Sequence, residues 1–315
     1  MKIINNYTKK KKKISYMSVV RWLMFSGSRL ITLLVQKQRN KFLSPKMKKV
    51  FIETLSFCNN DCVFCPASRK TGKKNPNHKM TEETFEKIIL QLRRINFKGV
   101  LALYCNNEPL IDSRATHFVR TLRGEFPENR IEIITNGMTL TLPLAKELFD
   151  NGLSSLIINH YDDNLMLSER LSKFAAGFAE SPYHKNVNIF LRLKNEVLSN
   201  RAGNAENAAK LEKFLPLWCS LPFEQLYFNY AGEAILCCSD VLWEVVGGDI
   251  NVNSIEEILY GRQFLRVREA LLEGRRDKVT LCARCDFMGI SHSPKAFLNT
   301  IVSVLGPKDL KTRNF

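Results

Sequence analysis

Apolar runs alternate with amphipathic stretches from residue 49 onward, and this alternation predicts most of the fold. Short runs rich in Val, Ile, Leu and Phe predict buried strands at 49–57, 99–105, 131–135, 154–161 and 187–194. Between these runs, apolar residues at helical spacing predict helices at 81–95, near 113–124, at 142–152 and near 166–178. Apolar strands separated by amphipathic helices are typical of a parallel sheet covered by helices. The pattern therefore predicts an α/β fold.

Start and stop signals support two of these helices. Thr81 is a suitable N-cap for the helix at 81–95, and Glu82 and Glu83 fall in its first turn, where negative charge favours the helix dipole. Gly152 can end the helix at 142–152, because glycine adopts the left-handed conformation that often follows a helix.

Polar groups follow several of the predicted strands, at the point where each strand ends. Each group alone has an ordinary explanation, such as a turn at Asn136-Gly137. Because the carboxyl ends of parallel strands meet at one edge of a sheet, however, these groups are expected to lie close together. They predict one pocket, built from the cysteine-rich loop 57–68, residues 106–109, residues 135–137, residues 159–161, and Arg192 with Lys194.

The loop after the first predicted strand carries Cys58, Cys62 and Cys65 in a C-x3-C-x2-C pattern. Three thiolates so close together suit a soft metal or an iron–sulfur cluster. A [4Fe–4S] cluster has four irons, so three protein thiolates leave one iron open for chemistry, as in catalytic zinc sites. The competing interpretation is a zinc knuckle completed by His78 or Cys105.

A second set of cysteines lies in the C-terminal part. Its members are Cys219, Cys237, Cys282 and Cys285, and taken alone they are also compatible with a zinc ribbon. Of the two remaining cysteines, Cys105 ends an apolar strand and is expected in the core. The last one, Cys238, adjoins a predicted ligand and is either a packing residue or an alternate ligand.

Composition restricts the function. Residues 1–50 contain 11 Lys and 3 Arg and no acidic residue, which leaves 33 basic and 31 acidic residues in the rest of a chain whose net charge is +16. A nearly neutral body does not provide the basic groove of a nucleic-acid-binding protein, so nucleic acid is not expected as a partner. Nine cysteines, mostly at ligand-like spacings, indicate a reducing, cytoplasmic compartment rather than a disulfide framework.

The N-terminal extension has two parts. Residues 1–16, with five consecutive lysines at 9–13, are expected to form a disordered, solvated tail. Residues 17–39 have an amphipathic pattern without the uncharged run of ~18 residues that a membrane span needs. They predict either a helix docked on the body or a basic helix in peripheral contact with an anionic membrane.

Residues 58–65, CNNDCVFC, resemble the signature loop of the radical S-adenosylmethionine (SAM) superfamily. The resemblance extends over residues 49–195 and implies a partial (β/α)6 barrel. It implies that Cys58, Cys62 and Cys65 bind a reducing [4Fe–4S] cluster whose open iron chelates SAM. It also implies that Phe64 packs near the adenine and that Asn107-Glu108-Pro109 corresponds to the Gly-Glu-Pro motif of the family, with Asn in place of Gly. The further SAM contacts are expected at Thr135, Asn136, Asn159 and Arg192.

The second cysteine set resembles the shortened SPASM domain, called twitch, which holds one auxiliary [4Fe–4S] cluster. Four protein ligands leave no open iron, which suits an electron acceptor better than a substrate-binding metal. The resulting domain prediction is a basic tail and amphipathic helix at 1–46, a radical SAM core at 47–200, an auxiliary cluster domain at 201–300, and a C-terminal tail at 301–315.

The resemblance implies an oxidoreductase that forms a 5′-deoxyadenosyl radical and removes a hydrogen atom from its substrate. The compact size and the cysteine spacing resemble the branch that dehydrogenates deoxy-scyllo-inosamine in aminoglycoside biosynthesis, so the favoured reaction is the two-electron oxidation of a sugar or aminocyclitol alcohol. A radical epimerase, a peptide-modifying enzyme and, outside this class, a zinc-stabilised binding module remain alternatives. An electron donor such as flavodoxin or ferredoxin is expected as a partner.

One polar stretch, SNRAGN at 199–204, lies between the two predicted domains. Its Asn and Gly content is typical of a surface linker. The alternative hypothesis is that Arg201 reaches into the pocket and binds, or deprotonates near, a hydroxylated substrate. Binding is the safer role because arginine is a poor general base.

Overall fold

The computed structural model describes residues 1–5, 29, 45–66 and 78–289. The strands of these residues form one nine-stranded sheet in the order β1-β6-β5-β4-β3-β2-β7-β8-β9. Neighbours from β1 to β7 are parallel, and β8 and β9 are antiparallel. The strands are β1 (Lys2–Asn5), β2 (Lys49–Ile52), β3 (Val100–Ala102), β4 (Ile131–Thr135), β5 (Ser155–Tyr161), β6 (Val187–Arg192), β7 (Gln225–Phe228), β8 (Glu233–Ile235) and β9 (Val246–Asp249).

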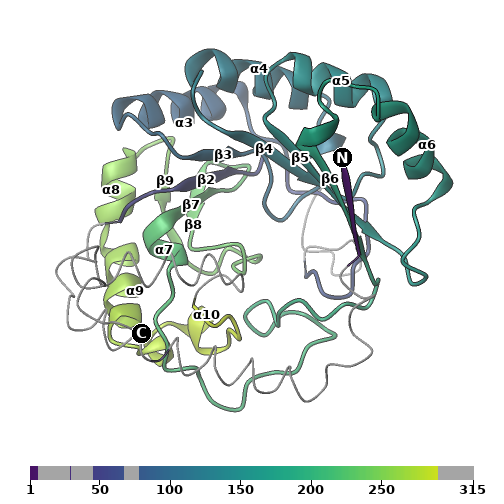
Figure 1. Ribbon diagram of the computed structural model, residues 1–315. Helices are drawn as coiled ribbons and strands as arrows, with labels where there is room; N and C mark the ends of the chain where they lie inside the picture. Colours follow the sequence, from purple (N-terminus) through teal and green to yellow (C-terminus); the bar gives the residue numbers. More distant parts are fainter. Residues whose placement is uncertain (6–28, 30–44, 67–77, 290–315) are drawn as a thin grey trace, which may run out of the picture.

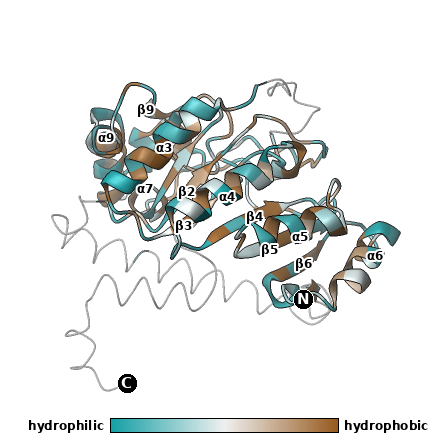
Figure 2. Ribbon diagram, turned by 90° about the horizontal axis from the view of Figure 1, so that it is seen from above, coloured by the Kyte–Doolittle hydropathy of each residue, from teal (hydrophilic) through white to brown (hydrophobic). Residues whose placement is uncertain are grey.

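Four helices cover the outer, convex side of the curved sheet (Figure 1): α3 (Glu82–Arg94), α4 (Ala115–Glu125), α5 (Leu142–Asp150) and α6 (Glu169–Phe178). Figure 2 shows polar and apolar residues interleaved along these helices, as expected where one face of each helix packs on the sheet. The C-terminal third adds α7 (Leu221–Glu224), α8 (Ile255–Tyr260), α9 (Arg262–Leu272) and α10 (Thr280–Ala283). Three short 3-10 helices are η3 (Pro109–Ile111), η4 (His184–Asn186) and η5 (Arg276–Lys278).

The alternation of strands and helices predicted from the sequence is confirmed. Thr81 caps α3 through its side-chain oxygen, which accepts from the amide of Thr84 at 3.1 Å. Gly152 follows α5 with a φ of +100°, the left-handed conformation expected of a residue that ends a helix. The predicted start of α6 near 166 is wrong by three residues, because Ser168 provides the N-cap hydrogen bond to Leu171.

The expectation that residues 1–16 are wholly disordered is wrong for the first five residues. Lys2–Asn5 form β1, which pairs in parallel with β6 at the edge of the sheet. An edge position needs only one side of backbone hydrogen bonds, so a four-residue strand with two central isoleucines can occupy it. In the described residues, seven neighbouring strands are therefore parallel, from β1 to β7 in the sheet order, and the strand at one edge comes from the N-terminal extension.

The amino-terminal end of the barrel is filled with side chains. Phe51 stacks on Tyr227 with 4.3 Å between ring centroids and meets Tyr104 edge-on at 5.4 Å. At the start of β2, Lys49 forms an ion pair with Glu132, and the Tyr104 hydroxyl donates to the same carboxylate at 3.1 Å. This packing closes one end of the barrel and leaves the carboxyl ends of the strands as the place for a site.

The amphipathic segment 17–39 and the tail 301–315 lie outside the described residues, apart from Arg29. Among the described helices, none combines the length and the apolar character needed to cross a membrane. Because β7 pairs directly with β2, the C-terminal part continues the same sheet, and the predicted limits of the domains stay a prediction.

Candidate active site

The three-cysteine loop begins five residues beyond the end of β2, at the carboxyl edge of the sheet. The amide of Cys65 donates to the carbonyl of Cys62 at 3.0 Å, which folds the loop into a tight turn. Burial, together with the neighbouring Cys65 and Cys58, raises the pKa of Cys62 to about 12. A cationic iron centre would reverse this penalty for the Cys62 thiolate, and the three sulfur atoms are the soft donors that such a centre prefers.

The zinc alternative finds little support in the geometry. Within the described ranges, no three His, Cys, Asp or Glu side chains converge closely enough to hold a single metal ion. A [4Fe–4S] cluster differs in this respect, because each thiolate binds its own iron atom. Of the two proposed fourth ligands, His78 stacks on Tyr230 at 4.9 Å, and the sulfur of Cys105 accepts from Asn106 Nδ2 at 3.4 Å.

Hydrogen bonds of Asn136 and Glu108 connect this loop to the end of β4. Asn136 Nδ2 donates to Asn59 Oδ1 at 2.8 Å and lies 3.9 Å from the sulfur of Cys58. The carboxylate of Glu108 accepts from Thr135 Oγ1 at 2.6 Å and from the amide of Asn136 at 2.7 Å. The buried Glu108 thus fixes the strand end that holds the cysteine loop, and its own oxygens are already engaged.

Asn107, which precedes Glu108 in the motif, has a side-chain donor that is available for a further hydrogen bond. Asn107 Oδ1 accepts from the amide of Cys105 at 3.0 Å, whereas its buried Nδ2 has no hydrogen-bond partner. An unpaired buried amide costs free energy, and a ligand with oxygen acceptors would satisfy it. This orphaned donor is available for an oxygen atom of a bound ligand.

A second group of predicted residues lies along β5 and β6. Phe64 is buried, and its ring centre lies 5.3 Å from that of Tyr161. Arg192 donates from Nε to Asn159 Oδ1 at 3.0 Å and from Nη1 to Glu196 at 3.0 Å. Asn159 and Tyr161 are two residues apart in one strand and therefore point to the same side of the sheet. The structure thus groups the predicted SAM contacts into two clusters at the same rim.

The four cysteines of the second set line one cavity. Burial raises the pKa of Cys219 to about 11, and it raises the pKa of Cys237 further, with added repulsion from the other thiols. The amide of Cys285 donates to the carbonyl of Cys282 at 3.2 Å, as in other C-x2-C turns. A buried cavity with four converging thiols has the donor set of a closed [4Fe–4S] site.

The expectation that residues 199–204 form a surface linker is wrong. Asn200 is fully buried and exchanges hydrogen bonds with Asp286: its amide donates to Asp286 Oδ2 at 2.9 Å, and its Oδ1 accepts from the amide of Asp286 at 3.1 Å. Asn200 therefore holds this segment against the residue that follows Cys285. It can do so because a side-chain amide can form the hydrogen bonds that a helix or strand would otherwise provide to backbone groups.

Arg201 follows directly in a strained turn. Arg201, Ala202 and Gly203 have φ values of +48°, +54° and +81°, and left-handed backbone is costly for the first two. Arg201 Nη1 donates to the carbonyl of Cys238 at 3.0 Å. Burial by itself would lower the pKa of Arg201, but its electrostatic neighbours Cys65 and Cys238 raise it. Arg201 therefore lies near Cys65 of the first set and near Cys238, the residue that follows Cys237 of the second set.

Sequence reasoning missed two residues of this region. Glu196 anchors Arg192 from four residues further along the chain, a spacing that a pair of opposite charges in the sequence could have signalled. Asp286, which binds Asn200, has no local signal, because its partner lies 86 residues away.

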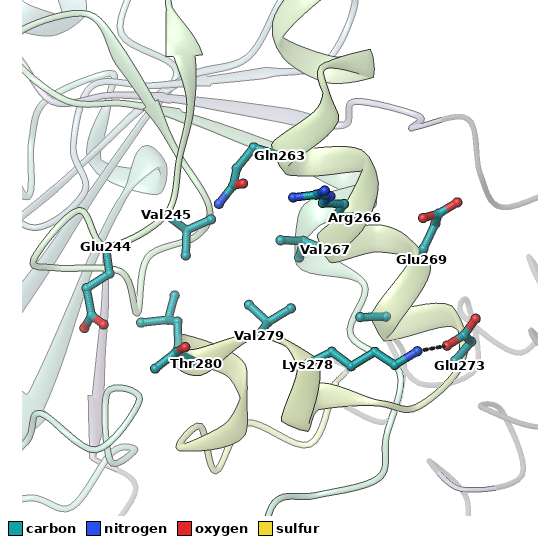
Figure 3. A pocket seen from close by; sticks show the side chains of 12 residues that line it. Glu244, Val245, Gln263, Arg266, Val267, Glu269, Glu273, Lys278, Val279 and Thr280 are labelled. Atoms are coloured by element: carbon teal, nitrogen blue, oxygen red, sulfur yellow. Dashed lines mark hydrogen bonds and ion pairs between the residues drawn. The ribbon is translucent and has the colours of Figure 1, made fainter.

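Another hollow lies on the outer side of the C-terminal part, between α9, η5 and the loop before β9 (Figure 3). Its charged groups include the ion pair of Lys278 with Glu273 at 2.8 Å, drawn in Figure 3, and Glu244, which pairs with Arg284 at 2.7 Å. None of the predicted ligand residues lines this hollow.

Comparisons with known proteins agree with this geometry. Residues 52–164 match the family model of the radical SAM superfamily, and residues 219–286 match that of the iron–sulfur cluster-binding SPASM domain. The chain is 26% identical, over 78% of its length and 96% of the relative, to the S-adenosyl-L-methionine-dependent 2-deoxy-scyllo-inosamine dehydrogenase of Niallia circulans.

Solved structures share the fold. The crystal structure of BtrN in complex with AdoMet and 2-DOIA superposes with a TM-score of 0.67 at 24% identity, over 78% of this chain and 94% of that one. The structure of anSMEcpe with bound AdoMet superposes with a TM-score of 0.51 at 13% identity, over 85% and 99% of the two chains.

Proposed function

We propose that this chain, which belongs to the radical SAM superfamily and carries a SPASM-type cluster-binding domain, oxidises a secondary alcohol of a sugar or aminocyclitol to a ketone. The observation that carries the proposal is the position of Arg201, which has Cys65 of the three-cysteine set as an electrostatic neighbour and donates to the carbonyl of Cys238, the residue after Cys237 of the four-cysteine set. A two-electron oxidation that starts with removal of a hydrogen atom needs a radical source on one side of the substrate and an electron acceptor on the other.

The residues present fit the cofactors of this family. Cys58, Cys62 and Cys65 would hold the reducing [4Fe–4S] cluster, and the four-thiol cavity would hold the auxiliary one. SAM bound at the reducing cluster supplies the radical chemistry that breaks an unactivated C–H bond. The protein contributes the orphaned Asn107 amide as a donor for SAM and the Phe64–Tyr161 ring pair as an apolar wall.

Arg201 provides the proposed substrate contact. Its guanidinium group has five N–H donors, of which one donates to the carbonyl of Cys238. The remaining donors can bind hydroxyl oxygens of the substrate and orient one C–H bond toward the radical source. Since arginine stays protonated, it holds the substrate and does not take its proton. The proton of the alcohol leaves to water in the pocket.

The substrate class rests on the dehydrogenase from Niallia circulans, whose name specifies 2-deoxy-scyllo-inosamine. An aminocyclitol or a related sugar alcohol is therefore the first choice. The test is to incubate anaerobically reconstituted protein with SAM, a reductant and a panel of aminocyclitols and sugars. Formation of one ketone for each 5′-deoxyadenosine supports the proposal, and SAM cleavage with no ketone from any member of the panel argues against this substrate class.

One observation favours an epimerase as the second candidate. Two thiols outside the predicted ligand sets, those of Cys105 and Cys238, are both electrostatic neighbours of Arg201. A radical epimerase uses a thiol as hydrogen-atom donor, and either cysteine is suitably placed. Reaction in deuterated water separates the candidates, because an epimerase incorporates one solvent deuterium into an unoxidised product and loses this activity when the donor cysteine is changed to alanine.

Two partners complete the proposal. A small electron carrier such as flavodoxin or ferredoxin would reduce the first cluster. The amphipathic segment 17–39, with the five lysines at 9–13 ahead of it, supports peripheral contact with an anionic membrane, because lysine and arginine near such a surface each contribute about 1 kcal/mol of attraction.

A further inference from the structure

Arg276 is a buried arginine whose partners, in the described part of the chain, are all backbone carbonyls. It lies in η5 with 1% of its surface exposed. Its Nε donates to the carbonyl of Leu217 at 2.8 Å and its Nη2 to that of Trp218 at 3.2 Å. Its Nη1 donates to the carbonyls of Phe287 at 2.6 Å and Cys285 at 3.4 Å. The guanidinium of Arg276 therefore connects the two chain segments that carry Cys219 and Cys285.

The same side chain faces the four-thiol cavity. Arg276 is the one charged residue among those that line the cavity in the described structure, and the others are the four cysteines, apolar residues and Ser239. Its guanidinium lies beside these thiols, and Nη1 donates to the carbonyl of Cys285. Two buried or half-buried carboxylates occur in the same part of the chain: Asp286 follows Cys285 and accepts from the amide of Asn200, and Asp240 accepts from the amides of Glu244 and Val245.

A buried guanidinium without a carboxylate is costly unless a negative group shares its surroundings. Four thiolates around an iron–sulfur core form such a group, and the core becomes one unit more negative when it accepts an electron. A fixed cation in a medium of low dielectric constant stabilises the more negative state more strongly. Cluster potentials depend on net charge and on nearby hydrogen bonds. Arg276 therefore favours the reduced form.

We propose that Arg276 is a positioning residue that raises the reduction potential of the auxiliary cluster, so that this cluster accepts the electron of the substrate radical. This inference rests on the proposed function. After loss of the hydrogen atom, the carbinol radical would give up one proton to water and one electron to the cluster that the four cysteines would hold, and its C–O bond would become the carbonyl. Arg276 thereby favours oxidation over return of a hydrogen atom.

The test uses the full chain with Cys58, Cys62 and Cys65 changed to alanine, so that the auxiliary cluster gives the only iron–sulfur signal. In this background we compare Arg276→Gln and Arg276→Lys by redox titration monitored with electron paramagnetic resonance. The matched control is Arg268→Gln, because Arg268 is also fully buried, donates to the carbonyl of Leu259 and does not line the cavity.

Arg276→Gln is expected to lower the equilibrium constant for one-electron reduction at least tenfold, a shift of about 59 mV to more negative potential. Arg276→Lys keeps the charge and is expected to stay within a few-fold of the parent, as is Arg268→Gln. An unchanged potential in Arg276→Gln at the parental iron content overturns the inference. Loss of the cluster from both Arg276 variants also overturns it, because the residue would then serve only as a structural clamp.

Failure of the proposed function gives a different result. The parent with three alanines would then bind zinc or no metal after anaerobic reconstitution with iron and sulfide, before Arg276 is changed. That result removes the auxiliary cluster and the inference together. A parent that binds about four irons, with an Arg276→Gln potential equal to its own, removes the inference alone.

Discussion

Replacement of Arg201 tests the proposed substrate contact. Arg201 donates one hydrogen bond to the carbonyl of Cys238 and has further donors available for a hydroxylated substrate. A hydrogen bond from a charged donor contributes about 1.5–3 kcal/mol. Loss of one such bond to the substrate in the transition state therefore lowers kcat/KM by about tenfold to about 150-fold, at about 1.4 kcal/mol for each factor of ten.

The strained backbone provides a control for misfolding. Arg201 has a φ of +48°, which costs a residue with a side chain about 1–2 kcal/mol but costs glycine almost nothing. Arg201→Gly is therefore expected to be about 1 kcal/mol more stable than Arg201→Ala, although both lose the guanidinium. If the side chain acts on the substrate, both variants lose the same activity despite their different stabilities.

The assay measures ketone formation at several substrate concentrations, together with release of 5′-deoxyadenosine in the absence of substrate. Release without substrate should stay at the wild-type rate, because it depends on the three-cysteine loop and on SAM. Wild-type kcat/KM in both Arg201 variants would refute the substrate contact. Activity that follows stability, with the glycine variant active and the alanine variant inactive, would show that only the turn matters.

Three further predictions concern the clusters, the barrel and the N-terminal extension. Cys58→Ala and Cys282→Ala should each lower the iron content from about eight to about four per chain, and only the first should abolish SAM cleavage; equal losses of cleavage would contradict separate roles. Lys49→Met should destabilise the fold by about 3 kcal/mol in urea unfolding, at the low end for a broken buried pair, because the buried Glu132 then keeps only the more exposed Arg130 as an ion-pair partner among the described residues. Burial alone would raise the pKa of Glu132, but Lys49 lowers it overall, so the wild type should lose stability as pH falls below the ordinary value of 4.5 and the variant should lose less; equal acid sensitivity would count against this pair. Replacing the five lysines at 9–13 with serine leaves β1 in place and should reduce flotation with anionic vesicles, whereas unchanged flotation would argue against membrane contact through these lysines.

Much of the fold could be predicted because hydrophobic periodicity is a local signal. The strands and helices between residues 49 and 195 follow from it, and Thr81 and Gly152 mark a start and an end where the structure has them. The edge strand β1 could not be predicted, because four residues beside a run of lysines carry no periodicity. Its position depends on the free edge of β6, which is far away in sequence.

The site was predictable where its residues lie at strand ends or in a cysteine motif. The segment around Asn200 was expected on the surface because its Asn and Gly content is typical of a loop. Its burial depends instead on a reciprocal pair of hydrogen bonds between Asn200 and Asp286. Arg276 carried no signal either. A charged residue is expected on the surface, and only the surrounding carbonyls and thiols of the folded chain explain its burial.

Transfer of deuterium from substrate to cofactor tests the central claim most directly. Anaerobically reconstituted protein is given SAM, a reductant and an aminocyclitol that carries deuterium on the carbon to be oxidised. The account predicts one deuterium in 5′-deoxyadenosine for each ketone formed, from brown protein with about eight irons per chain. Colourless protein with stoichiometric zinc, no cleavage of SAM and no ketone would contradict it.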